Sequence, residues 1–234
     1  MKKSLIYLSI AAMMIACTPK QDTERLICAE AEMNAFPYSE DGINVAKHQR
    51  ITPVEGVEGM EVIETFFINF GKPITVKGYE LCRTEVEAKD TVVWSLQPSS
   101  SAARLDWVLP VTEGFEKENY LGMNNTDYGG GIPVVDLWQR DGGIAIGLFE
   151  PVLRMISMPV EWKRYDNKVT MALHYDLPEP VVLEQGDTIH CFKAFRLSHK
   201  GDYFNALRIF SDYMQANEGV QMKPSEPEAF EPVW

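Results

Sequence analysis

The stretch Ile132–Glu150, IPVVDLWQRDGGIAIGLFE, contains the clearest fold signal in the 234-residue chain. Its centre, Asp141-Gly142, is a dipeptide typical of tight β-hairpin turns, and an apolar run lies on each side of it. The second run, Gly143–Glu150, carries small or apolar residues on both alternating faces, as expected for a strand that is covered on both sides. The stretch therefore predicts an antiparallel hairpin within stacked sheets.

Similar β patterns lie on both sides of this hairpin, separated by turn-forming residues. The further expected strands are Val62–Phe70, Ile74–Cys82, Thr91–Leu96, Arg104–Leu109, Val152–Lys163, Val169–Leu177 and Thr188–Leu197. Pro159 suggests that the strand containing it is an edge strand or carries a bulge. We predict a mostly β protein, with a large antiparallel β-sandwich, or supersandwich, over residues 24–200.

A helix is expected only near the carboxyl end, over residues 201–219. Apolar side chains at helical spacing are Tyr203, Leu207, Phe210 and Met214. Asp202 is placed to cap the first turn, and Gly219 to end the helix. One linker helix is therefore predicted after the sandwich.

Length and composition restrict the class of protein. The chain is 45% apolar and 24% charged, which is ordinary for a globular protein. A formal net charge of −12 and a sequence pI near 4.8 argue against nucleic acid as a partner. A complete (β/α)₈ barrel needs roughly 200–250 residues, so the chain can hold a barrel or a β-domain, but not both.

The amino-terminal residues 1–17 are typical of a bacterial lipoprotein signal peptide. Lys2 and Lys3 precede the apolar run Leu5–Ala16, and Cys17 follows at the position where cleavage and acylation would occur. Lipid on Cys17 would anchor the protein in the cell envelope, on the periplasmic or surface face of a membrane, with residues 18–23 as a tether. The alternative is an ordinary signal peptide with an incidental cysteine.

The other cysteines give no sign of a metal site. Cys28, Cys82 and Cys191 are odd in number, which leaves open one disulfide or buried thiols. No pair has zinc-ligand spacing, and we expect neither a metal nor a cofactor.

The segment Tyr120–Trp138, YLGMNNTDYGGGIPVVDLW, is the best candidate for ligand binding. It combines amides, carboxylates and aromatic rings, the groups that bind sugar hydroxyls and sugar C–H surfaces. The candidate substrate-binding residues are Asp127, Tyr128, Asp136 and Trp138. The alternative is a structured loop held by Asx-turns. No residue is assigned a catalytic role, and His174 and His190 are expected to be structural because they lie on predicted strands.

Three stretches together resemble the amino-terminal part of melibiase-type α-galactosidases, a group similar to glycoside hydrolase family 36. They are Asp127–Pro151, Gly201–Gln215 and Pro227–Trp234. The resemblance implies a β-supersandwich, a linking helix and, from residues 220–234, the start of a catalytic barrel. It also implies a retaining parent enzyme whose nucleophile and acid/base aspartates both belong to the barrel. Asp127 best matches an aspartate that reaches the sugar pocket in some relatives.

This resemblance favours a non-catalytic domain of a lipoprotein α-galactosidase-like enzyme. Such a domain would be inactive alone, would pack on a catalytic barrel in cis or in trans, and would form one wall of a pocket for a galactoside-type carbohydrate. The alternative is a stand-alone carbohydrate-binding envelope lipoprotein. A third interpretation is a purely structural envelope lipoprotein.

Overall fold

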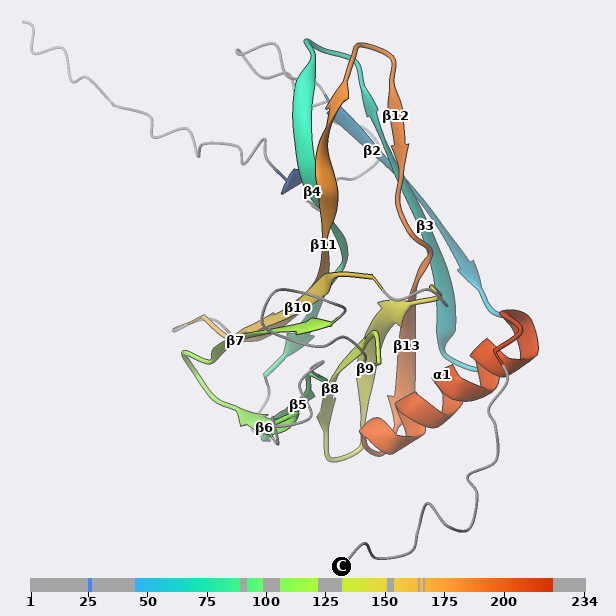
Figure 1. Ribbon diagram of the computed structural model, residues 1–234. Helices are drawn as coiled ribbons and strands as arrows, with labels where there is room; N and C mark the ends of the chain where they lie inside the picture. The colour runs from blue at the N-terminus through green and yellow to red at the C-terminus, as the bar shows by residue number, and fades with distance from the viewer. Residues whose placement is uncertain are drawn as a thin grey trace, which may run out of the picture.

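The computed structural model describes residues 25–26, 45–88, 92–98, 106–121, 132–150, 154–163, 165 and 167–220. Within these ranges the chain forms two packed β-sheets and one α-helix, as Figure 1 shows. The predicted fold, a mostly β sandwich followed by one helix near the carboxyl end, is confirmed.

One sheet has five strands. Their order across the sheet is β1 (Arg25–Leu26), β4 (Ile74–Glu87), β11 (Lys168–Leu183), β10 (Ile156–Glu161) and β7 (Glu116–Leu121). β1 runs parallel to β4, and the other neighbours are antiparallel.

The other sheet has eight strands and is antiparallel throughout. Its main order is β12 (Thr188–His190), β3 (Met60–Asn69), β13 (Ala194–Lys200), β9 (Gly142–Leu148), β8 (Val134–Gln139), β5 (Val93–Leu96) and β6 (Val108–Val111), and β2 (Val45–Pro53) also pairs with β3. β8 and β9 form the predicted hairpin. Gln139 pairs with Gly142, so the turn lies at Arg140-Asp141, one residue before the Asp-Gly pair that predicted it.

The main core lies between the sheets and follows the strand alternation. Met171, Leu173 and Tyr175 of β11 face the other sheet, where Leu137 of β8 and Ile146 of β9 are fully buried. His174, between Leu173 and Tyr175, points to the opposite face of the sheet. Apolar burial of this extent is the main stabilising contribution to such a sandwich.

The helix α1 (Tyr203–Asn217) covers part of the outer face of the eight-stranded sheet (Figure 1). The Asp202 carboxylate accepts a hydrogen bond from the Phe204 N–H at 3.2 Å, which confirms the expected N-cap. Ala206, Phe210 and Met214 are buried against a second apolar cluster on this face. Within the described residues, this helix is too short and too polar to span a membrane.

The edge-strand interpretation of Pro159 is wrong. β10 lies between β7 and β11, and Pro159 pairs in register with Glu118 of β7. On the β11 side, paired positions occur at residues 156–157 and 160–161 and are interrupted at 158–159. The interruption coincides with the residue that has no N–H to donate, which explains how a central strand tolerates proline.

Two of the three remaining cysteines are described, and both are thiols. Cys82 is buried in β4 and Cys191 is partly buried after β12. Cys28 and the lipid-modified candidate Cys17 lie outside the described residues.

Candidate functional site

The sequence-predicted binding residues divide into two groups. Asp127 and Tyr128 lie outside the described residues, in the segment that joins Leu121 of β7 to β8. This segment connects an edge of the five-stranded sheet with the eight-stranded sheet. Asp136 and Trp138 lie on β8 and share the face that α1 covers.

Asp136 is fully buried and pairs with a histidine from another strand. Its Oδ1 lies 3.0 Å from Nε2 of His199 on β13, and both side chains have an exposed fraction of 0%. The second carboxylate oxygen, Oδ2, is buried and has no hydrogen-bond partner among the described residues. The carboxylate therefore faces the interface between helix and sheet, not solvent.

The pKa of each member of this pair is raised. For Asp136, burial raises the pKa more than the hydrogen bond with His199 lowers it. For His199, burial lowers the pKa, but the hydrogen bond with Asp136 and its negative charge together raise the pKa by more than burial lowers it. A proton held between the two groups is thus favoured by the fold.

Trp138 lies two residues further along the same face of β8. It is 8% exposed, and its ring centroid is 5.2 Å from that of Tyr203, the first residue of α1. The Asp136–His199 pair joins β8 to β13, and the Trp138–Tyr203 contact holds the start of the helix against the sheet. The structure brings these two predicted residues together at this interface.

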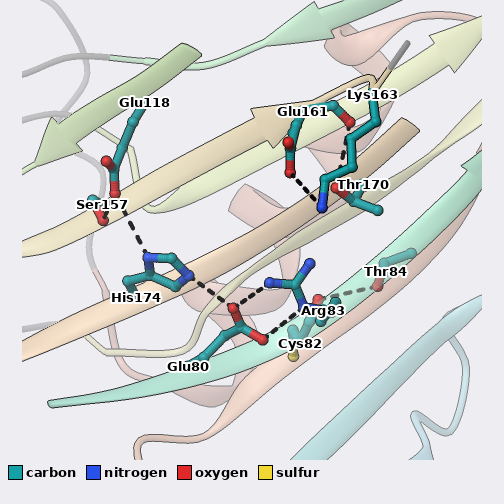
Figure 2. Close-up of polar contacts among 10 residues, drawn as sticks. All are labelled: Glu80, Cys82, Arg83, Thr84, Glu118, Ser157, Glu161, Lys163, Thr170 and His174. Carbon is teal, nitrogen blue, oxygen red and sulfur yellow. Dashed lines mark hydrogen bonds and ion pairs between the residues drawn. The ribbon is translucent and has the colours of Figure 1, made fainter. Parts of the chain in front are cut away.

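A second polar group, which we call the outer-face network, lies on the five-stranded sheet (Figure 2). Its members are Glu80 and Arg83 of β4, His174 of β11, Ser157 of β10 and Glu118 of β7. Residues beside them in the sequence, such as Leu81, Leu173 and Met158, belong to the inter-sheet core. Strand alternation therefore places the network on the opposite face of the sheet.

His174 lies between the two carboxylates of the network, as Figure 2 shows. Its Nε2 is 2.9 Å from Oε2 of Glu80, and its Nδ1 is 3.6 Å from Oε1 of Glu118. Arg83 donates from Nε and Nη2 to the two oxygens of Glu80, at 2.8 and 2.7 Å. The Ser157 hydroxyl donates to Glu118. Four adjacent strands are thus joined through side chains.

The two carboxylates differ in burial, but both have lowered pKa values. Glu80 is 1% exposed, and burial alone would raise its pKa; hydrogen bonds with His174 and Arg83 outweigh that effect. The nearby His174, helped by hydrogen bonds from Ser157 and Tyr120, lowers the pKa of Glu118 to about 2. Groups that stay ionised at neutral pH are poor proton donors, so the network favours a strand-joining role over acid catalysis.

Sequence reasoning missed the network because no short motif encodes it. Glu80 and His174 are 94 positions apart, and the chain has 34 acidic residues from which to choose. The only signal was a histidine on a predicted strand. Within the described part of the chain, no group of three or more His, Cys, Asp or Glu residues could hold a metal ion.

Comparison with known proteins supports the sequence resemblance. No family model matches the chain. The A type blood alpha-D-galactosamine galactosaminidase of Flavonifractor plautii is 29% identical over 100 residues, which are 43% of this chain and 8% of that protein.

Solved structures give a longer match. The galactosidase domain of the alpha-galactosidase-sucrose kinase AgaSK superposes with a TM-score of 0.51 at 13% identity, over 70% of this chain and 23% of that chain. The GH36 alpha-galactosidase AgaA of Geobacillus stearothermophilus gives a TM-score of 0.49 at 12% identity, over 70% of this chain and 23% of that chain. The chain spans less than a quarter of each solved chain, and the matched region is the amino-terminal portion. The match to the AgaSK domain therefore confirms the predicted resemblance at the level of fold.

Proposed function

We propose that this chain is the non-catalytic β-sandwich domain of an α-galactosidase-like glycoside hydrolase. The observation that carries the proposal is the unequal coverage of the fold match, which takes in 70% of this chain but 23% of the galactosidase domain of AgaSK. Such a match accounts for a domain and not for a whole enzyme. In this proposal the sandwich packs on a catalytic (β/α)₈ barrel, in cis or in trans, and is inactive alone.

The attachment of α1 supports a linking role for that helix. Phe210 and Met214 anchor its middle and its last turn, and the Trp138–Tyr203 contact anchors its start. A helix fixed at both ends defines the direction of the chain that follows it. That geometry suits a domain whose task is to hold a barrel in a set orientation.

The proposed galactoside contacts are Asp127 and Tyr128, in the segment between β7 and β8. Asp136 and Trp138 lie on β8, the strand that follows this segment, and both are buried, with Trp138 against Tyr203 of α1. We thus assign the sugar contacts to the segment between β7 and β8. The role of the buried Asp136 and Trp138 is to fix β8, the strand that follows this segment.

The first test is hydrolysis of 4-nitrophenyl α-D-galactopyranoside. The purified chain alone is expected to give no rate above background. Co-expression with a barrel encoded after or beside the Trp234 codon is expected to give a stable complex and galactosidase activity. Hydrolysis by the chain alone would overturn the proposal, because it would make the chain itself catalytic. Failure to form a complex with such a barrel, together with galactoside binding by the chain alone, would favour the stand-alone binding lipoprotein.

The second test concerns Asp127 in the assembled enzyme. Asp127→Asn is expected to lower kcat/KM for the galactoside at least tenfold, since a hydrogen bond between a charged group and a substrate hydroxyl contributes about 1.5–3 kcal/mol. Asp212→Asn is the matched control, because Asp212 lies on the exposed side of α1. Equal activities of the two variants would remove Asp127 from the pocket.

The proposed location is the cell envelope, with Cys17 as the lipid attachment point. The support is the residue pattern around Met14-Ile15-Ala16-Cys17. Cells grown with labelled palmitate are expected to label the wild-type protein but not Cys17→Ser, with Cys28→Ser as the control. Equal labelling of the wild-type protein and Cys17→Ser would contradict the anchor.

A further inference from the structure

A cleft of about 780 Å³ opens between the two sheets, and its lining includes no member of the outer-face network or of the Asp136–His199 pair. We call it the inter-sheet cleft. Glu58 from the β2–β3 turn, Glu61 of β3, and Arg196 and Ser198 of β13 line one side, and Thr84 and Glu85 of β4 line the other. Its volume falls in the range of about 300–1,000 Å³ that is usual for small-molecule sites.

Glu61 and Arg196 form an ion pair in this cleft through one carboxylate oxygen and two of the three guanidinium nitrogens. Arg196 donates from both Nε and Nη2 to a single oxygen, Oε2 of Glu61, at 3.0 and 2.7 Å. Glu61 Oε1 and Arg196 Nη1 have no partner among the described residues. The side chains are 33% and 35% exposed, so the remaining acceptor of Glu61 and the remaining donor of Arg196 are both accessible to a ligand.

The turn that forms one wall of the cleft is held by a close backbone contact. Gly59 has a φ of +78°, and a Cβ at this position would lie 2.3 Å from the carbonyl oxygen of Ser198. The Ser198 N–H donates to the Gly59 carbonyl at 2.9 Å. Because only glycine permits this approach, the β2–β3 turn is fixed beside Arg196 and the cleft is built into the fold.

The charges of the cleft restrict the class of ligand. Glu58 disfavours an anion, and the other charged groups are already paired, Glu61 with Arg196 and Glu85 with Lys168. The guanidinium in turn disfavours a simple cation. A neutral ligand whose groups both donate and accept hydrogen bonds fits best, and adjacent sugar hydroxyls have this property.

We propose that the inter-sheet cleft binds a neutral saccharide. One sugar hydroxyl donates to Glu61 Oε1, and another accepts from Arg196 Nη1. This site is separate from the segment containing Asp127 and does not depend on the proposed association with a barrel.

The test titrates the full chain by calorimetry with raffinose, maltotriose and xylotriose, and with inorganic phosphate and spermidine as ionic probes. At least one of the sugars is expected to bind and to shift the Arg196 Nε–H resonance in NMR spectra. Glu61→Gln and Arg196→Lys are each expected to weaken binding about tenfold or more, because a charged hydrogen-bonding group is lost or displaced.

Glu64→Gln is the matched control. Glu64 lies on the same strand as Glu61 but on its other face, beside Arg50 and Lys193, and this variant is expected to bind normally. Asp127→Asn is likewise expected to bind normally, which separates this site from the proposed galactoside contact. Thermal unfolding identifies any variant that fails to fold. If Glu61→Gln does not fold, the test rests on Arg196→Lys.

The outcomes divide clearly. Sugar binding that is lost in the cleft variants and kept in Glu64→Gln supports the proposal. Failure of all three sugars to bind, binding unaffected by both cleft variants, or binding of phosphate or spermidine in place of sugar would each overturn it.

Discussion

Asp136 Oδ1 and His199 Nε2 lie 3.0 Å apart, although another strand, β9, separates the strands that carry them. The pair meets above Gly143 of β9, where a Cβ would lie 2.8 Å from His199 Nε2. Absence of a side chain at one position thus lets two buried titratable groups meet across three strands, beneath the start of α1.

Asp136→Ala is expected to destabilise the protein by about 3–5 kcal/mol, because it leaves His199 buried without its partner. Urea unfolding at pH 6 measures the loss. Asp212→Ala, at an exposed position on α1, is the control and should stay within about 0.5 kcal/mol of wild type. A loss below about 1 kcal/mol in Asp136→Ala would show that the pair contributes little.

The stability contributed by this pair is expected to fall as pH rises above neutrality. Asp136 raises the pKa of His199 above its ordinary value of 6.5, so the folded protein binds a proton more tightly than the unfolded chain. The contribution from His199 is present below pH 6.5 and is lost as pH rises through the pKa of the folded state. The measurement is the stability difference between wild type and Asp136→Ala at pH 6 and at pH 9. A larger difference at pH 9 would contradict the assignment.

Gly143→Ala is expected to cost about 1–3 kcal/mol, as overpacking usually does. The new methyl group would lie 2.5 Å from the Leu137 carbonyl oxygen and 2.6 Å from Trp138 Cβ, as well as against His199. The control is Gly219→Ala, where a Cβ meets no atom within 4 Å and only the left-handed backbone, with φ of +66°, opposes the change. Loss of near-ultraviolet tryptophan signal in the Gly143 variant alone would report displacement of Trp138.

Glu118 is expected to titrate near pH 2 in carboxyl-detected NMR, because the nearby His174 and the hydrogen bond from Ser157 stabilise its ionised form. Its pKa is lowered, so its contribution to stability is present above the ordinary value of 4.5 and is lost as pH falls toward 2. His174→Gln should raise the pKa of Glu118 more than Ser157→Ala does, since His174 has the larger effect. An unchanged pKa in His174→Gln would contradict the network. The effect on stability is expected to be small, because Glu118 is 37% exposed and solvent screens its charge.

The fold could be predicted largely from local patterns, whereas the paired side chains could not. Alternation around Ile144 predicted the β8–β9 hairpin because strand periodicity and turn chemistry are both local. Asp136 and His199 are 63 positions apart, and their pairing depends on strand order, which alternation does not encode. The burial of Trp138 could not be predicted for the same reason. Alternation along β8 identifies which residues share a face, but not that α1 covers that face.

Phe210→Ala is expected to loosen α1 from the sheet and to cost about 3–5 kcal/mol, as truncation of a buried aromatic ring usually does. Phe210 is 8% exposed, and its ring stacks on Phe195 of β13 with 5.3 Å between centroids. Arg208→Ala is the control, because Arg208 lies on the exposed side of the same helix. Hydrogen exchange should show faster exchange across α1 in Phe210→Ala while the strands of the five-stranded sheet keep their protection. Uniform loss of protection in both regions would instead show that the helix and the sandwich unfold as one unit.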